Sequence, residues 1–400
     1  MVMGEIKEYI KKILELGINL EEGDALIIYI PNELSEIEKI FLELKDEYKI
    51  KDIIFIKVDF ARISSFLKKT PSYEEMYNFS PQYNSIRSPK RIKVIKFISA
   101  LECNPYYKKL VGTQATLFGA YRKIFEFKNI ELSRQIERSP EILVTCPNSF
   151  WAKYLFGSGK EIDKLWSLVT QTVPTMEEAK RLIEDLEEKT KILNDMQIAD
   201  LNIKTESGTD LTVSLSPASV WINAFCNSKN GGIALNFPSY EICTSPNMCT
   251  TTGKAVLTRP VHYNGIKIKN AELEFKDGRV IRCSTPSKAW VDLITNAKNR
   301  LNYIGEVALV SSDSPIAQLD GSFGEIQLDE NTGCHIALGD SLEECIDPKR
   351  FNMLPEEDID CFFSSSHHQD LPIGDSGTTV EIKSPRYGRK LILTYGRWNL

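Results

Sequence analysis

The chain has 400 residues, 42% of them apolar, and a formal net charge of -6 from 49 basic and 55 acidic residues. Because one hydrophobic core seldom serves so long a chain, the length predicts two domains. The slight negative charge offers no field that would attract nucleic acid or anionic lipid, so we expect neither nucleic acid nor a membrane as a partner.

The first segment of the chain predicts an amphipathic helix, which Gly17 ends. Its apolar residues repeat at i, i+3, i+4, i+7 and i+8; they are Ile6, Tyr9, Ile10, Ile13 and Leu14. Acidic residues stand between the apolar ones and no small-residue cleavage site follows, so we expect neither a secretory signal nor a membrane span. A cytoplasmic location is therefore predicted.

The next elements alternate between strand and helix. Residues 25–30 and 53–58 are short, continuous apolar runs, and the segment between them, 34–44, has apolar residues at helical spacing. Residues 93–98 and 142–145 add two candidate strands. Continuous apolar strands are buried on both faces, and parallel strands need helical crossovers. The first domain is therefore predicted to be of the α/β class, with a mostly parallel sheet covered by helices.

A long helix is expected to close this first domain. Thr175 and Glu178 form a T-x-x-E capping box ahead of helically spaced apolar residues, and we place the domain boundary where the helix ends, giving domains 1–195 and 196–400. Beyond the boundary the chain changes to short alternating stretches, with hairpin signals suited to type I′ turns at 264–265 (Asn-Gly) and 277–278 (Asp-Gly). The second domain is predicted to be a β-rich α+β domain.

Nine cysteines are spread along the chain without a CxxC pair or zinc-finger spacing. An odd number of widely separated cysteines indicates reduced thiols rather than a framework of disulfides. This expectation agrees with a cytoplasmic location.

Carboxylates and imidazoles gather in short, separate segments of the second domain. The candidate residues are Glu241, Glu306, Glu330, His335, His368 and Asp370. Two dications close together repel each other unless several carboxylates neutralise them, and neutral imidazoles complete such sites. The mixture therefore predicts a pair of divalent cations held by the second domain.

Each of these segments also has an ordinary interpretation. His368 and Asp370 project from one face if their segment is a strand, but an isolated H-x-D motif is more often a solvated loop. His335 lies where a turn meets an apolar run, which fits a core histidine equally well. Glu306 begins a strand that looks buried, where a carboxylate must be paired, protonated or bound to a cation. Glu241 carries no signal by itself.

Taken in order, these segments resemble the thermophilic-type metalloaminopeptidases, the family of aminopeptidase T and aminopeptidase S. The resemblance covers nearly the whole chain. It is carried by INLEEGDALIIYIP near the start, SGTDLTVSL at 207–215, NFPSYEICTSP at 236–246, RPVHYNGIKI, FKDGRVI, YIGEVALV, SSDSPIAQ, LDENTGCHIALG and HQDLPIG. Matches in the same order over this length are far more specific than any single motif.

The resemblance implies a set of metal ligands, which are Glu241, Glu306, His335, His368, Asp370 and, as a further ligand or an acid behind the ligands, Glu330. It implies a hydrolase with two divalent metal ions, zinc, cobalt or manganese, that removes N-terminal amino acids from short peptides. It also implies a homodimer whose active sites face an enclosed chamber. Glu241 or Glu306 would act as the catalytic base that assists metal-activated water, or as the carboxylate between the two ions.

Two positions depart from the family pattern. The family carries a catalytic tyrosine three residues beyond the last glycine of the CHIALG segment, and Leu342 occupies that position here. Pro372 likewise stands where another hydrophobic residue is usual. Loss of one oxyanion donor typically lowers turnover by about 10² to 10³. Three alternatives follow from the missing tyrosine. The protein is a slow peptidase, another side chain such as Tyr240 donates the hydrogen bond to the oxyanion, or the substrate is an amide other than an ordinary peptide.

Three functions follow from the sequence. The favoured one is a dinuclear metalloaminopeptidase that acts on short peptides. The second is a metal-dependent amide hydrolase or transferase, repurposed for a small non-peptide or biosynthetic amide. The third is a catalytically silent binding or scaffold protein, against which the retained set of costly charged ligands argues.

Overall fold

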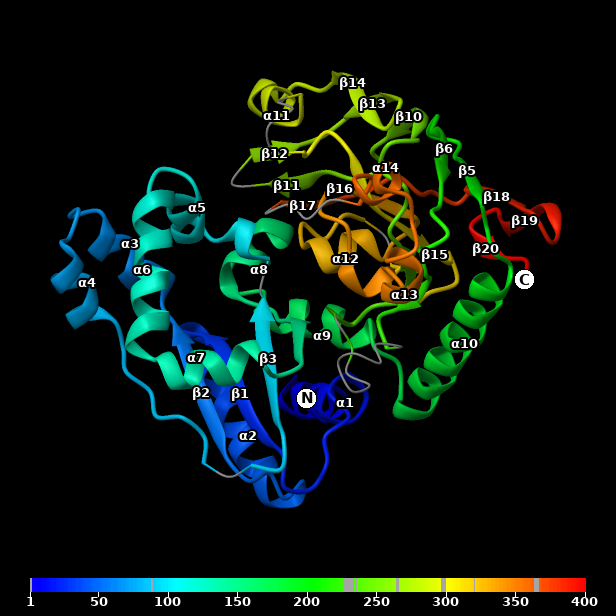
Figure 1. The fold of residues 1–400 in the computed structure, drawn as a ribbon. Helices are drawn as coiled ribbons and strands as arrows, with labels where there is room; N and C mark the ends of the chain where they lie inside the picture. The colour runs from blue at the N-terminus through cyan, green and yellow to red at the C-terminus, as the bar shows by residue number, and fades with distance from the viewer. Residues whose placement is uncertain are drawn as a thin grey trace. The chain divides into compact units, whose positions relative to one another are not determined.

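The computed structural model describes residues 2–87, 89–98, 100–225, 234, 236–263, 266–295, 300–319, 321–362 and 367–400. The chain forms two compact units (Figure 1). Unit 1 comprises Met1–Met176 and Asn227–Pro238, and unit 2 comprises Glu177–Cys226 and Ser239–Leu400.

The division differs from the predicted boundary at residue 195, because the long helix α10 (Met176–Asp195) packs on the second unit. The Asn194 side-chain amide donates to the Trp221 carbonyl oxygen at 2.8 Å, and that of Asn223 donates to Thr190 Oγ1 at 2.9 Å. The sequence therefore located the helix, whereas tertiary contacts decide the unit to which it belongs.

Unit 1 is built on a five-stranded, fully parallel sheet with the order β2-β1-β3-β4-β8. The strands are β1 (Ala25–Pro31), β2 (Ile53–Val58), β3 (Ile92–Ile98), β4 (Glu141–Thr145) and β8 (Asn236–Phe237). The first four confirm the predicted strands to within a residue or two. The fifth comes from the segment that returns to this unit after α10, which the sequence did not indicate.

Helices cover both faces of this sheet, as predicted. Ile27 and Val94 on one face pack with Leu132 of α7, and Phe41 of α2 lies edge-on to Phe97 on the other face. The helices are α1 (Val2–Lys12) with a π-turn (Ile13–Gly17), α2 (Ser35–Glu47), α3 (Phe60–Leu67), α4 (Tyr73–Phe79), α5 (Pro105–Val111), α6 (Ala115–Lys128), α7 (Ile130–Glu137), α8 (Ser149–Phe156) and α9 (Ile162–Gln171), with 3-10 turns at Asn32–Leu34 and Leu101–Cys103.

Unit 2 is dominated by antiparallel sheets, as predicted. One sheet has the order β14-β13-β10-β6-β5-β18-β19-β20, a second has the order β17-β16-β15-β9-β7, and β11 and β12 form a ribbon. The strands are β5 (Asp200–Lys204), β6 (Asp210–Ser214), β7 (Ile222–Asn223), β9 (Glu241–Thr244), β10 (Thr252–Val256), β11 (Val261–Tyr263), β12 (Ile266–Ile268), β13 (Glu272–Lys276), β14 (Arg279–Ser284), β15 (Ile304–Val310), β16 (His335–Gly339), β17 (His368–Pro372), β18 (Thr379–Ser384), β19 (Gly388–Thr394) and β20 (Arg397–Trp398).

The helices of unit 2 are short apart from α10. They are α11 (Lys288–Ile294), α12 (Ile326–Glu330), α13 (Pro348–Phe351), α14 (Glu356–Ile359) and a 3-10 turn (Glu343–Cys345). Within the described part of the chain, no helix is both long and apolar enough to cross a bilayer.

One of the two predicted hairpin turns can be examined directly. Asp277 and Gly278 join antiparallel β13 and β14 with φ angles of 49° and 80°. Positive φ at both positions is the requirement of a type I′ turn, so this prediction is confirmed. The predicted turn at 264–265 lies outside the described residues, but its flanking strands β11 and β12 pair antiparallel.

The expectation that all nine cysteines are reduced is wrong for one pair. Cys249 and Cys361 form a disulfide in unit 2, with their Cα atoms 5.5 Å apart. This spacing is typical of disulfides, but 112 residues of sequence separate the partners, and only the fold brings them together.

Candidate metal centre

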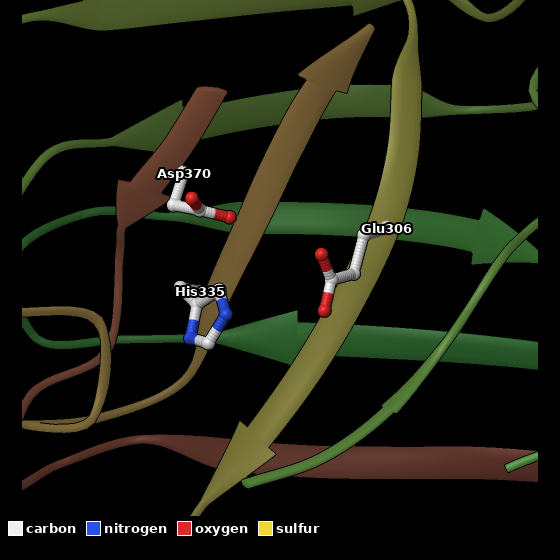
Figure 2. Close-up of side chains that lie close together, drawn as sticks. All are labelled: Glu306, His335 and Asp370. Carbon is white, nitrogen blue, oxygen red and sulfur yellow. The ribbon is translucent and has the colours of Figure 1, made fainter. Parts of the chain in front are cut away.

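The five-stranded sheet of unit 2 carries five of the six predicted ligands on neighbouring strands, and the sixth, Glu330, ends helix α12. Ala337 in β16 stands opposite Glu306 in β15 and opposite Asp370 in β17. Because side chains alternate along a strand, His335 lies on the same face two residues earlier. One donor atom from each of Glu306, His335 and Asp370 lies within 4.8 Å of the other two. Figure 2 shows the three side chains converging from three strands.

Glu241 and His368 extend this group on the same face, which we call the metal face. Glu241 in β9 stands opposite Val310 in β15, and its Oε2 lies 3.4 Å from His335 Nε2. His368 Nε2 lies 3.1 Å from both Glu306 Oε2 and Asp370 Oδ1. The H-x-D motif is therefore part of a strand, and its two side chains share a face, as predicted.

His335 is held with one ring nitrogen free to act as a ligand. The imidazole is 1% exposed, and its Nδ1 lies 3.0 Å from the backbone carbonyl oxygen of Glu330. A carbonyl oxygen only accepts hydrogen bonds, so Nδ1 carries the proton and the Nε2 lone pair points toward Glu241. This arrangement is typical of metal-binding histidines, whose other nitrogen donates to a carbonyl or carboxylate.

Buried negative charge accumulates around these histidines. Burial, and then the charges of Asp370, Glu241 and Glu306, raise the pKa of Glu330 well above its ordinary value. Burial likewise raises the pKa of Glu241 to about 7, with Glu306 and Asp370 adding to the effect and His335 opposing it. Carboxylates this close are costly to keep ionised together unless cations neutralise them.

The pKa of His368 is shifted by the same group of carboxylates. Burial alone lowers the pKa of this imidazole, but Asp370 and Glu306 outweigh burial and raise it well above its ordinary value. The acidic groups around His368 therefore favour positive charge at this place, which a bound cation also supplies.

The residues fit a divalent metal by an independent observation. Glu241 Oε2 is buried and, within the described ranges, has no hydrogen-bond partner. A buried carboxylate oxygen without a donor is costly in a native protein, and a bound cation, or a water molecule held beside one, satisfies it. The remaining donors are carboxylate oxygens and imidazole nitrogens, which suit zinc, cobalt and manganese.

Several supporting residues escaped prediction. Gln369, on the opposite face of β17, accepts a hydrogen bond from Trp290 Nε1 at 2.8 Å, which fixes the strand that carries His368 and Asp370. Asn331 is fully buried, and its Oδ1 accepts from the backbone N–H of Tyr240 at 2.7 Å, next to Glu241. The only signal in the sequence is that these amides interrupt or precede apolar runs.

Leu342 lies in a small apolar cluster beside the metal face. Cys243, Ala308 and Cys345 form the buried part of the cluster, and Ile222 and Leu342 pack against it. Cys243 follows Glu241 by two residues in β9, so its side chain lies on the metal face. Leu342 therefore contributes an apolar side chain to a cluster that includes Cys243 of the metal face.

The chain is similar to known proteins over nearly its whole length. The sequence model of the family described as thermophilic metalloprotease (M29) matches residues 3–398. Aminopeptidase PepS of Streptococcus thermophilus is 25% identical over 367 residues, 85% of each chain. Aminopeptidase AmpS of Bacillus subtilis (strain 168) is 25% identical over 414 residues, 98% of each chain. The structure of wild-type AmpT from Thermus thermophilus matches with a TM-score of 0.81 and 22% identity over 100% of both chains, which shows a shared fold.

Proposed function

The chain belongs to the thermophilic metalloprotease (M29) family, and from this premise we propose that it is an aminopeptidase that releases N-terminal amino acids from short peptides with two divalent metal ions. The observation that carries the proposal is the presence of three acidic and two imidazole side chains on the metal face, with the buried Glu330 of α12 electrostatically coupled to them. The relatives that match over most of their length are named aminopeptidases, which agrees with this assignment.

The charge of the site favours two ions rather than one. Glu241, Glu306, Glu330 and Asp370 carry four negative charges when ionised, and two divalent cations carry four positive charges. A single dication would leave buried carboxylates without compensation. Zinc, cobalt and manganese all suit this donor set, and metal analysis of the purified protein distinguishes them.

Divalent cations in such a site supply Lewis acidity and lower the pKa of water. We assign Glu306, His335, His368 and Asp370 to holding the ions, because donor atoms of Glu306, His335 and Asp370 lie within 4.8 Å of one another and His368 Nε2 lies 3.1 Å from both carboxylates. We assign Glu241 as the general base, since its Oε2 has no hydrogen-bond partner in the described part of the chain. Its carboxylate would take a proton from the attacking water and return it to the leaving amine.

The experiment that tests this function compares two substitutions on metal content and turnover. We expect Glu306→Gln to lose bound metal and activity together. We expect Glu241→Gln to retain metal but to lower kcat on a dipeptide panel by about 10² to 10⁴, the range for a lost general base. Glu274→Gln, an exposed position on β13, serves as the control. A metal-loaded wild type that cleaves none of the panel contradicts the proposal.

A second function is favoured by one observation, the apolar side chain of Leu342 beside the ligands. Without a tyrosine there, an ordinary peptide loses an oxyanion donor, and a different, less polar amide would be the better substrate. Tyr240 is 6% exposed, and burial raises the pKa of its hydroxyl. Under this alternative, Leu342→Tyr raises kcat on dipeptides by about 10² or more. Rapid hydrolysis of dipeptides by the wild type would contradict this second function.

Homodimerisation and cytoplasmic location are part of the same proposal and come from the family resemblance. The Cys249–Cys361 disulfide is a feature that oxidising compartments favour, so it gives no support to the predicted location. Sedimentation of the purified protein tests the dimer, and fractionation of the producing cells tests the location.

A further inference from the structure

Unit 1 contains a cavity of about 420 Å³ at the carboxyl ends of β1, β2 and β3. The ends of the three strands line it together with helices α6 and α7, which cover this face of the sheet. Its volume falls within the range of small-molecule sites, roughly 300 to 1,000 Å³. The cavity lies wholly within unit 1, whereas the metal face belongs to unit 2.

The position of the cavity in the sheet is the one at which α/β sheets bind ligands. From β1 the chain passes to β2 on one side, and then crosses back to β3 on the other side of β1. At such a reversal of strand order the connections diverge and leave a crevice outside the carboxyl ends of the strands. The cavity is lined by the last residues of both β1 and β3, on the two sides of this reversal.

Aromatic side chains form much of the cavity wall. They come from strand and helix, and they are Tyr29, Phe60, Phe118, Tyr121 and Phe125. Burial, followed by the nearby charges of Glu141 and Glu126, raises the pKa of Tyr29 to about 12. Its hydroxyl therefore stays protonated at neutral pH and is able to donate a hydrogen bond. Such a wall suits a flat apolar group with a polar end.

Two charges stand in the stripe of α6 that faces the cavity. The lining residues of this helix fall at i, i+3, i+4, i+7 and i+8; they are Phe118, Tyr121, Arg122, Phe125 and Glu126. An amphipathic helix would fill all these positions with apolar side chains to pack against a sheet. Two of the positions are instead occupied by the charged residues Arg122 and Glu126, and both of these residues are exposed to solvent at the edge of the cavity.

The charged side chains of Arg122 and Glu126 are available to form ion pairs with a ligand. Lys57 and Lys96, which also line the cavity, are paired with Glu38 and Glu141 at 2.9 and 2.5 Å. Arg122 and Glu126 form no ion pair with any residue that the structure describes. They also stand in the order Arg then Glu at i and i+4, which is the weaker orientation for pairing with each other along a helix.

We propose that this cavity binds an aromatic α-amino acid as its zwitterion. Arg122 receives the carboxylate, Glu126 receives the ammonium group, and the side chain enters the aromatic interior. One turn of helix, about 6 Å, separates the two residues along α6. A ligand that pairs with both must carry its two charges close together, as an α-amino acid does and a longer peptide does not. The proposal does not depend on the activity at the metal face.

Isothermal titration calorimetry with three related probes tests the proposal on the full-length protein. The probes are L-tryptophan, tryptamine, which lacks the carboxylate, and indole-3-propionate, which lacks the ammonium group. Titration into protein treated with a chelator removes binding of an amino acid to metal ions in unit 2. We expect L-tryptophan to bind, and each analogue to bind about tenfold more weakly because one charge-assisted pair is lost.

Substitutions on α6 assign the two ends of the ligand. We expect Arg122→Ala to weaken L-tryptophan about tenfold while leaving tryptamine unchanged, and Glu126→Gln to weaken it similarly while leaving indole-3-propionate unchanged. Lys123→Ala, an exposed neighbour that does not line the cavity, should bind all three probes as the wild type does. Absence of L-tryptophan binding, equal affinity for tryptamine, or wild-type affinity in Arg122→Ala would each overturn the proposal.

Discussion

The buried ion pair between Asp24 and Lys93 in unit 1 gives a sharp test of how the first unit is held together. Asp24 immediately precedes β1 and has a fully buried side chain, and the Lys93 side chain is 3% exposed. Lys93 Nζ lies 3.0 Å from Asp24 Oδ2, and it also donates to the Ile18 carbonyl oxygen at 2.7 Å. The substitution Asp24→Asn keeps the shape and removes the charge.

The expected cost follows from what remains after the substitution. Lys93 would stay buried with carbonyl oxygens as partners but no carboxylate. Arg91, whose Nε lies 3.1 Å from Asp24 Oδ1, would lose a partner but is 42% exposed and can turn to water. Removing one partner of a buried pair typically costs about 3 to 5 kcal/mol, because the other charge is left uncompensated. We expect Asp24→Asn to lower the free energy of unfolding of unit 1 by this amount at neutral pH.

The pH dependence of this difference has a definite sign. Burial alone would raise the pKa of Asp24, but hydrogen bonds from the Glu21 backbone N–H, Arg91 and Lys93 outweigh it and lower the pKa below its ordinary value. A carboxyl whose pKa is lowered on folding stabilises the folded state above its unfolded pKa, roughly 3.9, and loses this contribution as pH falls through the folded pKa. The gap between wild type and variant should therefore narrow only below about pH 4.

Urea denaturation followed by circular dichroism from pH 7 to pH 3 measures this gap. Glu22→Gln is the matched control, because its ion pair with Lys49 is more than half exposed on both sides and should contribute less than about 1 kcal/mol. A loss below about 1 kcal/mol for Asp24→Asn at pH 7, or a gap that widens on acidification, would refute the reasoning.

Two further predictions concern unit 2. A Cβ built on Gly305 would overlap the Asp340 carbonyl oxygen, and Gly305 lies at the bulge that sets the register of Glu306. Because the substitution would displace Glu306, Gly305→Ala should lower metal affinity about 10- to 100-fold in a metal titration. Unchanged metal affinity in this variant contradicts the prediction. Cys361→Ser should lower stability by about 2 to 4 kcal/mol under non-reducing conditions, because the disulfide closes a long loop. The half-buried free thiol Cys283, changed to Ser, is the control, and a reductant should abolish the difference between wild type and Cys361→Ser.

Local pattern was enough to locate most elements of unit 1. Residues 25–30 and 53–58 were recognisable as strands because a parallel strand is buried on both faces and is apolar without interruption. The helix α10 was recognisable from its spacing, but its spacing does not reveal the surface against which it packs. The two-residue strand β8 carries too short a pattern to be noticed, and it joins the sheet only because the chain returns to unit 1.

The types of residue at the candidate metal centre were also available from the sequence, because dications require carboxylates and imidazoles whatever the fold. Their convergence was not, since it depends on the register of β9, β15, β16 and β17, which local pattern leaves open. The resemblance to a known family supplied that information indirectly. The structure adds the side-chain contacts, above all the carbonyl that fixes His335.

By itself, then, the sequence determined which segments form helices and strands and which chemical groups the protein has for binding metal, because both follow from residues near one another in the chain. Only the tertiary structure decided which unit α10 joins, that Cys249 meets Cys361, that donor atoms of Glu306, His335 and Asp370 lie close together, and that charges on α6 stand at the mouth of a cavity in unit 1. Each of these depends on contacts between residues far apart in sequence, and strand order and register fix such contacts only when the whole chain has folded.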